Sequence, residues 1–183
     1  MLVFVHQIIN ASSKHTQIIR RKRVVLTRIV FRDAKESDMP MIRKFTVETG
    51  WASIPESLRT YLDREKWNKH MVEVFENIHN RENSEIFVAE GERDRFVGYL
   101  FVGESRDMMT GLTFGFIYDI FVEEKSRGKR IGKMLMEKAE SYCREKGFSR
   151  IALHVSAAND SAMRLYHRMG FRPEQMYLGK ELK

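Results

Sequence analysis

Cysteine and long apolar runs are scarce in this chain of 183 residues, and their scarcity excludes several classes of protein. A single cysteine, Cys143, rules out an internal disulfide and any zinc cluster built from cysteines. The apolar start, residues 2–9 (LVFVHQII), contains His6 and Gln7 and is too short to span a membrane. It lacks the basic n-region and the small-residue cleavage site of a signal peptide. We therefore expect a cytoplasmic protein that has no membrane contact and binds no metal.

Positive charge is concentrated near the amino terminus. Residues 1–23 hold five basic side chains and no acidic one, which leaves +2 of the net charge of +7 for the rest of the chain. The cluster at residues 20–23 (RRKR) could contact RNA or the ribosome, although solvated charge is the commoner meaning of such a run. The nearly balanced remainder does not predict a nucleic-acid surface. We expect a basic extension over residues 1–23, followed by one domain over residues 24–183.

The hydrophobic pattern indicates an alternation of strands and helices. The predicted order is strand, two helices, three strands, helix, strand, helix and a closing strand. This order lacks the repeated βαβ units of a Rossmann fold and favours an α/β fold with a mixed, mostly antiparallel sheet. The predicted elements cover residues 27–32, 37–49, 56–79, 85–90, 95–104, 117–122, 130–146, 151–155, 159–169 and 176–182.

The segment from Phe116 to Met136 (FIYDIFVEEKSRGKRIGKMLM) combines a strand, a basic turn and a helix. Apolar β-branched and aromatic residues over 117–122 indicate a half-buried strand. Apolar residues then recur at helical spacing as far as Gly147, which suits a helix C′ position. Such a junction points backbone N–H groups and the positive end of a helix dipole at one spot, so it predicts an anion site. An ordinary solvated basic turn is the alternative.

A second segment, NDSAMRLYHRMGF at residues 159–171, follows the short strand predicted at 151–155. Together the two segments resemble the signature motifs of the GNAT acetyltransferase superfamily, with a likeness to its protein N-terminal acetyltransferase branch. The first resembles the pyrophosphate loop, and its matching residues are Arg127, Gly128, Lys129, Arg130, Ile131 and Gly132. The second resembles the family's helix motif, and its matching residues are Asn159, Ala162, Leu165, Tyr166, Gly170 and Phe171.

This resemblance implies a GNAT fold from about residue 28 to residue 182, with a sheet that splays at the cofactor site. It also implies acetyl-CoA as co-substrate, with the basic turn on the pyrophosphate. Free strand backbone beside the turn would hold the pantetheine arm, and its N–H groups would stabilise the oxyanion. The contacts expected from the resemblance are Ile120, Phe121, Val122, Arg127, Gly128, Lys129, Arg130, Ile131, Gly132, Lys133, Asn159 and Tyr166.

The resemblance also implies which residues transfer protons in the reaction. Tyr166 would protonate the departing CoA thiolate, although packing between helix and sheet is its simpler role, and Asn159 would serve as a helix cap in either case. Strand parity places Asp119 on the face opposite Ile120, so we do not expect Asp119 to be the base. His154 lies on the neighbouring strand, and histidine titrates near neutral pH. Its Leu-His-Val context resembles that of some protein N-terminal acetyltransferases, in which the histidine relays a proton through water. A buried core histidine is the alternative.

One position departs from the family pattern, because Arg130 stands where the first glycine is usual. An arginine there is tolerable at φ < 0 and strained at φ > 0.

The acceptor is less determined than the cofactor. We expect an N-acetyltransferase that acetylates a primary amine, most naturally a protein N-terminal or lysine amine, by direct attack in a ternary complex. A polyamine or another small amine, and a non-catalytic acyl-CoA-binding module, are the alternatives. Loops at 50–55 and 105–113, together with the tail, would select the acceptor. A homodimer is left open.

Overall fold

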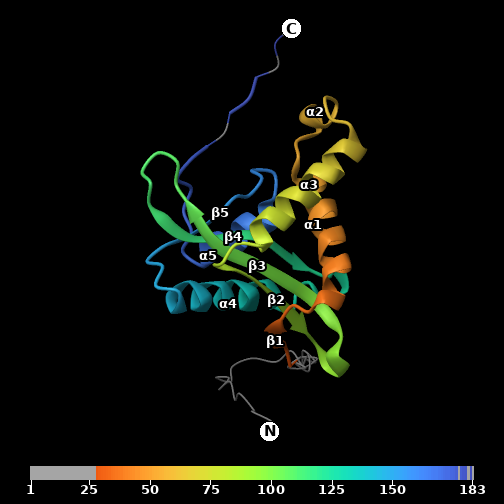
Figure 1. The fold of residues 1–183 in the computed structure, drawn as a ribbon, viewed down its shortest axis with the longest axis vertical. Helices are drawn as coiled ribbons and strands as arrows, with labels where there is room; N and C mark the ends of the chain where they lie inside the picture. The colour runs from red at the N-terminus through yellow and green to blue at the C-terminus, as the bar shows by residue number, and fades with distance from the viewer. Residues whose placement is uncertain (1–27, 177, 181, 183) are drawn as a thin grey trace, which may run out of the picture.

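The structure is a computed structural model that describes residues 28–176, 178–180 and 182. The predicted basic extension therefore lies outside the described residues. Figure 1 shows a twisted sheet with helices on both faces, which confirms the predicted α/β class. None of the described helices is long and apolar enough to cross a membrane.

The sheet has five strands in the order β1-β2-β3-β4-β5. The first four strands are antiparallel to their neighbours, and β5 runs parallel to β4 at the edge. The predicted mixed, mostly antiparallel sheet is thus confirmed. The strands are β1 (Val30–Asp33), β2 (Ser84–Glu90), β3 (Phe96–Arg106), β4 (Thr113–Val122) and β5 (Ile151–Leu153).

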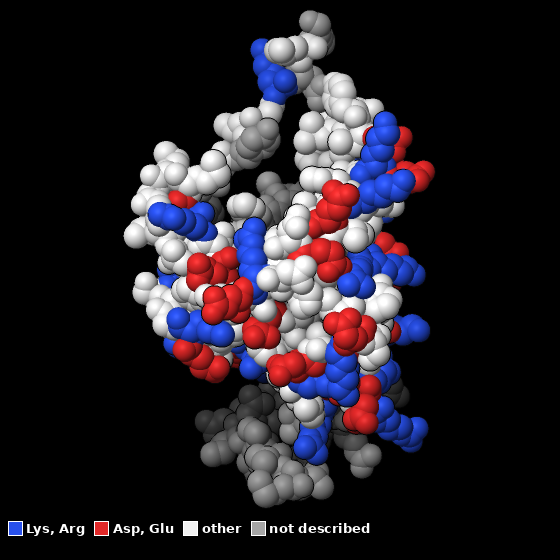
Figure 2. Space-filling view, viewed as in Figure 1, with Lys and Arg blue, Asp and Glu red and all other residues white. Residues whose placement is uncertain are grey.

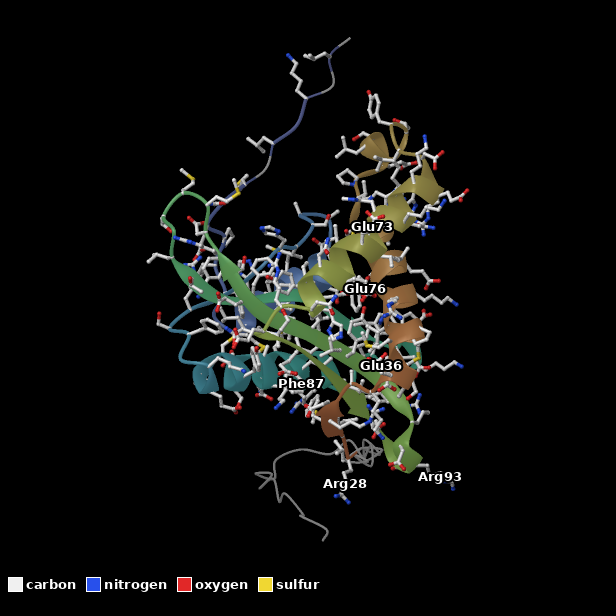
Figure 3. All side chains as sticks on the ribbon, in the orientation of Figure 1. Arg28, Glu36, Glu73, Glu76, Phe87 and Arg93 are labelled. Atoms are coloured by element: carbon white, nitrogen blue, oxygen red, sulfur yellow. The ribbon has the colours of Figure 1, made fainter. Side chains whose placement is uncertain are left out.

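The first face of the sheet is covered by α1 (Met39–Ser53) and α3 (Arg64–His79), which follow the short turn η1 (Glu36–Asp38). Their shared core includes Ile42, Phe75, Val88 and Phe101, all nearly inaccessible to solvent. An ion pair between Arg43 and the partly exposed Glu76 links the two helices, and Figure 3 labels Glu76 on α3.

Two predictions on this face are wrong. The helix α1 continues through Gly50 to Ser53, so most of the predicted loop at 50–55 is helical. The long helix predicted at 56–79 is interrupted, because α2 (Glu56–Arg59) ends before Asp63 caps α3 by accepting the Lys66 amide at 2.9 Å.

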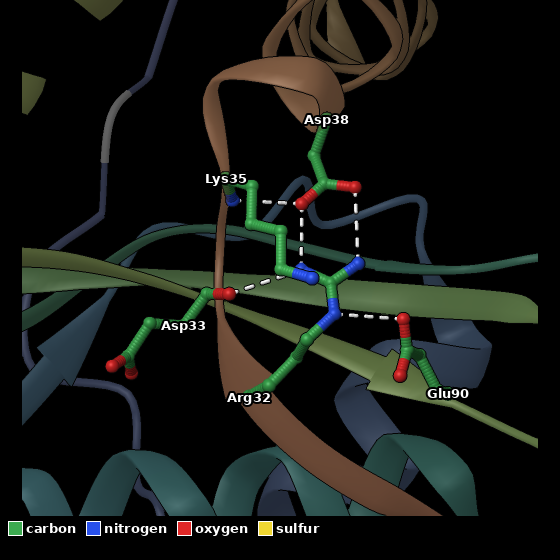
Figure 4. Close-up of polar contacts among 5 residues, drawn as sticks. All are labelled: Arg32, Asp33, Lys35, Asp38 and Glu90. Carbon is green, nitrogen blue, oxygen red and sulfur yellow. Dashed lines mark hydrogen bonds and ion pairs between the residues drawn. The ribbon is translucent and has the colours of Figure 1, made fainter. Parts of the chain in front are cut away.

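The strand β1 is fixed to the start of α1 by a network around Arg32, shown in Figure 4. The guanidinium binds Asp38 at 2.6 Å and Glu90 of β2 at 2.7 Å. Its hydrogen bond to Asp38 lowers the pKa of that carboxyl. The network joins an edge strand to both its sheet partner and the helix that follows it.

The second face is covered by α4 (Ile131–Glu145) and α5 (Asp160–Arg168). Leu100, Leu135, Met136 and Ala139 form the centre of its core, and Phe87 reaches from β2 toward α4 (Figure 3). Cys143 also lies in this core, and burial raises the pKa of its thiol to about 11. The thiol is therefore a packing group.

The remaining differences between the predicted and the observed elements lie in the loops and in the tail. Residues 91–95 join β2 to β3 through the short turn η2 (Glu92–Asp94), which Arg93 marks in Figure 3. No strand forms among the described residues beyond Phe171, so the predicted closing strand is wrong for them. Glu174 pairs with Arg150 just before β5.

Acidic and basic side chains are interleaved on the face drawn in Figure 2.

Candidate active site

A β-bulge in the middle of β4 decides which side chains face each side of the sheet. Phe101 of β3 pairs with Asp119, but the next residue, Val102, pairs with Ile117, so Tyr118 is the extra residue. Ile117 packs in the α4 core, whereas Tyr118 packs against Phe101 in the α1–α3 core. The predicted parity is therefore wrong: Tyr118 does not share a face with Ile120, which packs against the α4 core.

The strands β4 and β5 part soon after they meet. They pair only at three positions, the last being Ile117 with Leu153. The Glu123 amide donates to Val97 of β3 at 2.9 Å, and the antiparallel alternation then turns the backbone groups of Phe121 toward β3 as well. The backbone groups of Ile120 and Val122 face the opening between β4 and β5. The predicted splay is present, and it offers the backbone of Ile120 and Val122 but not that of Phe121.

The turn after β4 leads through η3 (Glu124–Ser126) to the start of α4. Ser126 is fully buried, and its hydroxyl binds Arg95 of β3 at 3.2 Å. Arg95 also pairs with Glu123 at 2.5 Å. These contacts of Arg95 hold the turn against the sheet. No side chain caps α4, so the amides of its first turn remain available to an anion.

Arg130 is the N-cap of α4 and adopts φ 64°, ψ 11°, in the left-handed region. Gly128, two residues earlier, has φ 76°. Of the two outcomes considered for Arg130, the structure shows the strained one. An arginine in this conformation costs roughly 1–2 kcal/mol that a glycine would not pay.

The other predicted cofactor contacts near this turn differ in their surroundings. The Arg127 side chain donates to the Val122 carbonyl at 3.2 Å, so it spans the mouth of the opening. Lys133 pairs with Glu137 along the exposed side of α4. Lys129 is exposed. A side chain on Gly132 would place its Cβ 3.3 Å from Leu165 of α5, so this glycine serves the packing of the two helices.

The helix α5 presents Tyr166 from the other side of the opening. Asn159 caps the helix by accepting the Ala162 amide at 3.1 Å, as predicted. Tyr166 is only 7% exposed and lies in the α4 core, with its ring centroid 5.9 Å from that of Phe171. Burial raises the pKa of its hydroxyl, and the nearby charge of Asp119 raises it further. The hydroxyl has no hydrogen-bond partner within the described residues, so it is free to serve a ligand.

Asp119 is the residue that sequence reasoning missed. It is only partly exposed and accepts a hydrogen bond of 2.5 Å from the hydroxyl of the fully buried Tyr99. That hydroxyl also lies 2.9 Å from the Thr46 hydroxyl of α1. Burial raises the pKa of Asp119, and the hydrogen bonds from Tyr99 and Thr46 partly oppose the effect. A carboxylate poised in this way can accept a proton nearer neutral pH than an exposed one.

His154 directly follows the last paired residue of β5. It is exposed, and its ring meets the edge of Phe116 with centroids 5.1 Å apart. The alternative of a buried core histidine is therefore wrong. Asp119, Tyr166 and His154 come from β4, α5 and the end of β5, around the place where the two strands separate.

Comparison with known proteins agrees with this geometry. The model of the acetyltransferase (GNAT) family matches residues 51–171. The chain belongs to the GNAT family. An uncharacterized N-acetyltransferase of Bacillus subtilis, YdgE, is 36% identical over 67 residues, which are 37% of this chain and 43% of that protein. Streptothricin acetyltransferase of Streptomyces lavendulae is 38% identical over 89 residues, 49% of this chain and 45% of that protein.

The chain thus spans less than half the length of these two curated relatives. Among solved structures, a predicted acetyltransferase from Clostridium acetobutylicum with acetyl-CoA has a TM-score of 0.63 and 17% identity. That match covers 84% of this chain and 96% of the other, and it supports the GNAT fold.

The residues of this GNAT domain fit CoA in two respects. The uncapped start of α4 offers backbone donors to a pyrophosphate, and the parted strands leave Ile120 and Val122 able to bond an extended amide-bearing arm.

Proposed function

We propose that this protein is an acetyl-CoA-dependent N-acetyltransferase that transfers the acetyl group to a primary amine in a ternary complex. The observation that carries the proposal is the alignment of three features along one opening. The uncapped start of α4 lies at the end of β4, bare strand backbone follows, and Asp119 and Tyr166 flank the place where β4 and β5 part. These features supply anion binding, carbonyl binding and proton transfer in the order that the reaction needs.

The reaction assigns one role to each side chain. Asp119, or His154 through water, accepts a proton from the ammonium form of the acceptor, and the free amine attacks the thioester carbonyl carbon. The backbone N–H groups of Ile120 and Val122 stabilise the negative oxygen of the tetrahedral intermediate. When the C–S bond breaks, Tyr166 gives its proton to the sulfur. The attacking nitrogen then loses its second proton, which restores the Tyr166 phenol through solvent. The products are the acetylated amine, CoA thiol and the one proton held by the base, which is released to solvent.

The acceptor remains a choice between a protein amine and a small amine. The Leu-His-Val sequence favours a protein N-terminal or lysine amine. The relative named for streptothricin favours a small molecule. Both carry the primary amine that the proposed chemistry requires. We also propose a cytoplasmic location, where acetyl-CoA is supplied, while a homodimer and an RNA contact of residues 1–23 remain predictions.

A direct test measures CoA binding by calorimetry and thiol release with a panel of amines and peptides. Lys129→Glu reverses a charge beside the anion site and should weaken CoA binding roughly tenfold, about 1.4 kcal/mol. Lys66→Glu makes the same change on the exposed surface of α3 and should leave the affinity unchanged. Absence of CoA binding by the folded protein would refute the proposal. CoA binding without thiol release from any amine would instead identify a non-catalytic binding module.

A further inference from the structure

Three aromatic residues of β4 form a row on the face of the sheet that carries α3. The ring centroids of Phe114 and Phe116 lie 6.3 Å apart, and those of Phe116 and Tyr118 lie 5.1 Å apart. His154 stands edge-on against Phe116 from the neighbouring strand. We call Phe114, Phe116, Tyr118 and His154 the aromatic row. It combines four rings from two strands on one side of the sheet.

Core packing does not account for Phe116 and His154 in the aromatic row. Phe114 is buried and Tyr118 packs at the edge of the α1–α3 core, whereas Phe116 belongs to neither hydrophobic cluster. Phe116 and Tyr118 keep part of their surface accessible, and His154 is exposed. Clustered, partly exposed aromatic side chains are a common mark of a binding surface.

The aromatic row leads directly to the proposed base. Because β4 bulges at Tyr118, both Tyr118 and Asp119 face the α1–α3 side, where Asp119 meets Tyr99. Strand geometry puts Phe116 about 10 Å from Asp119 along β4, at roughly 3.3 Å per residue. An acceptor whose amine is held at Asp119 and whose body extends along β4 would therefore pass Tyr118 and approach Phe116 and His154.

Two guanidinium groups and two carboxylates lie beside the aromatic row. The Arg81 guanidinium lies 3.4 Å from the Tyr118 hydroxyl, and Arg150 lies over the Phe114 ring at 5.4 Å. Among the nearby acids, Glu104 accepts a hydrogen bond from Asn83 at 2.9 Å, and Glu174 pairs with Arg150. A polycation would meet the guanidinium of Arg81, for which no ion pair is found among the described residues, whereas an aromatic or apolar group would not be repelled.

We propose that the aromatic row is the acceptor-binding surface and that it selects a primary amine with a single positive charge beside an aromatic ring. This inference rests on the proposed acetyltransferase function and names the substrate class of the same site. A small arylalkylamine and a peptide with an aromatic first residue share this chemistry. The row disfavours polyamines, the small-amine alternative raised from the sequence.

The test compares matched acceptors at saturating acetyl-CoA. Phenethylamine against propylamine addresses the small-molecule source, and Phe-Ala-Ala amide against Ala-Ala-Ala amide addresses the peptide source. We expect kcat/KM to favour the aromatic member of at least one pair by roughly 10- to 100-fold, and spermidine to be the poorest acceptor. Phe116→Ala should reduce this preference to near unity without changing the KM for acetyl-CoA. Phe31→Ala removes a similarly buried ring from β1, packed on the opposite face, and should leave the preference intact.

Binding without turnover separates the two proposals. Ligand-observed NMR of the CoA-loaded protein should show phenethylamine or the Phe peptide bound to wild type and to Phe31→Ala, and lost from Phe116→Ala. This signal with no thiol release would overturn the proposed catalysis but keep the aromatic row as a binding surface. Equal use of aromatic and aliphatic members, preference for spermidine, or an unchanged preference in Phe116→Ala would overturn the inference. The Phe116→Leu variant, which keeps an apolar side chain, guards against a folding defect and should retain part of the preference.

Discussion

The pairing of Asp119 with Tyr99 makes a prediction about both activity and stability. Replacing Asp119 with asparagine keeps the shape of the side chain and an oxygen that can accept the Tyr99 hydrogen bond. The substitution removes the carboxylate that, in the proposed mechanism, takes a proton from the amine substrate. Turnover should therefore fall roughly 10²–10⁴-fold, the usual contribution of a positioned general base. The affinity for CoA should stay unchanged, because the CoA contacts proposed above lie elsewhere.

The effect on stability should have the opposite sign. Burial raises the pKa of Asp119 in the folded protein, so folding disfavours the ionised form. A carboxyl of this kind destabilises the fold above its folded pKa, and this cost disappears as the pH falls below the ordinary carboxyl range near pH 4. Asp119→Asn should therefore raise the free energy of unfolding at pH 7 and lose that advantage at low pH.

Both outcomes are measurable on one protein preparation. Thiol release at saturating acetyl-CoA reports turnover, and urea unfolding at several pH values reports stability. An Asp119→Asn protein with wild-type turnover would return the role of base to His154. A variant that is less stable at pH 7 would show that the buried carboxylate is stabilised by its hydrogen bonds, contrary to the dominant effect of burial.

Four further substitutions test the remaining assignments. Tyr99→Phe removes a hydrogen bond that favours ionised Asp119, so the acid limb of the kcat/KM profile should move to higher pH, and a limb that stays in place would contradict the role of Tyr99. Arg130→Gly should raise the free energy of unfolding by about 1 kcal/mol, less the entropy cost of glycine; an unfolding midpoint that falls would show that the left-handed arginine carries no strain. Tyr166→Phe should lower kcat roughly 10²–10⁴-fold with little change in CoA affinity, whereas unchanged turnover would make Tyr166 a packing residue. His154→Ala should lose activity chiefly at low pH, where most amine is protonated, and a uniform loss that follows thermal stability would indicate a structural role.

The elements that local patterns specify were predictable from the sequence. The strand before residue 123, the helix that begins at Ile131 and the cap at Asn159 follow from short-range periodicity and capping chemistry. The end of α2 was predictable in principle, because Asp63 is a typical N-cap three residues before Lys66. Gly50 illustrates the opposite case. Gly50 does not end α1, which continues to Ser53. A Cβ at Gly50 would lie 3.1 Å from the Trp67 ring, so the glycine permits the close approach of α3.

The geometry of the site depends on how neighbouring strands pair, and the sequence of a single strand does not reveal that pairing. A period of two placed Tyr118 on the face of Ile120, because the bulge at Tyr118 arises from the register with β3, while Asp119 does lie opposite Ile120 as predicted. The hydrogen bond from Tyr99 joins residues twenty positions apart through that same register. The clustering of Phe116 with His154 likewise depends on the brief parallel contact of β4 with β5. Aromatic residues at alternate positions were visible in the sequence, but their lack of core partners was not.

The close approach of Gly132 to Leu165 gives the last glycine of the anion loop a second meaning. Leu165 precedes Tyr166 in α5, so the distance between the first turn of α4 and the phenol is set by how little stands at position 132. A single methyl group there would force the Leu165 side chain, or the helix that carries it, to give by a few tenths of an ångström. The glycine therefore lets the first turn of α4 approach α5 closely, and it joins the two sequence motifs through one packing contact.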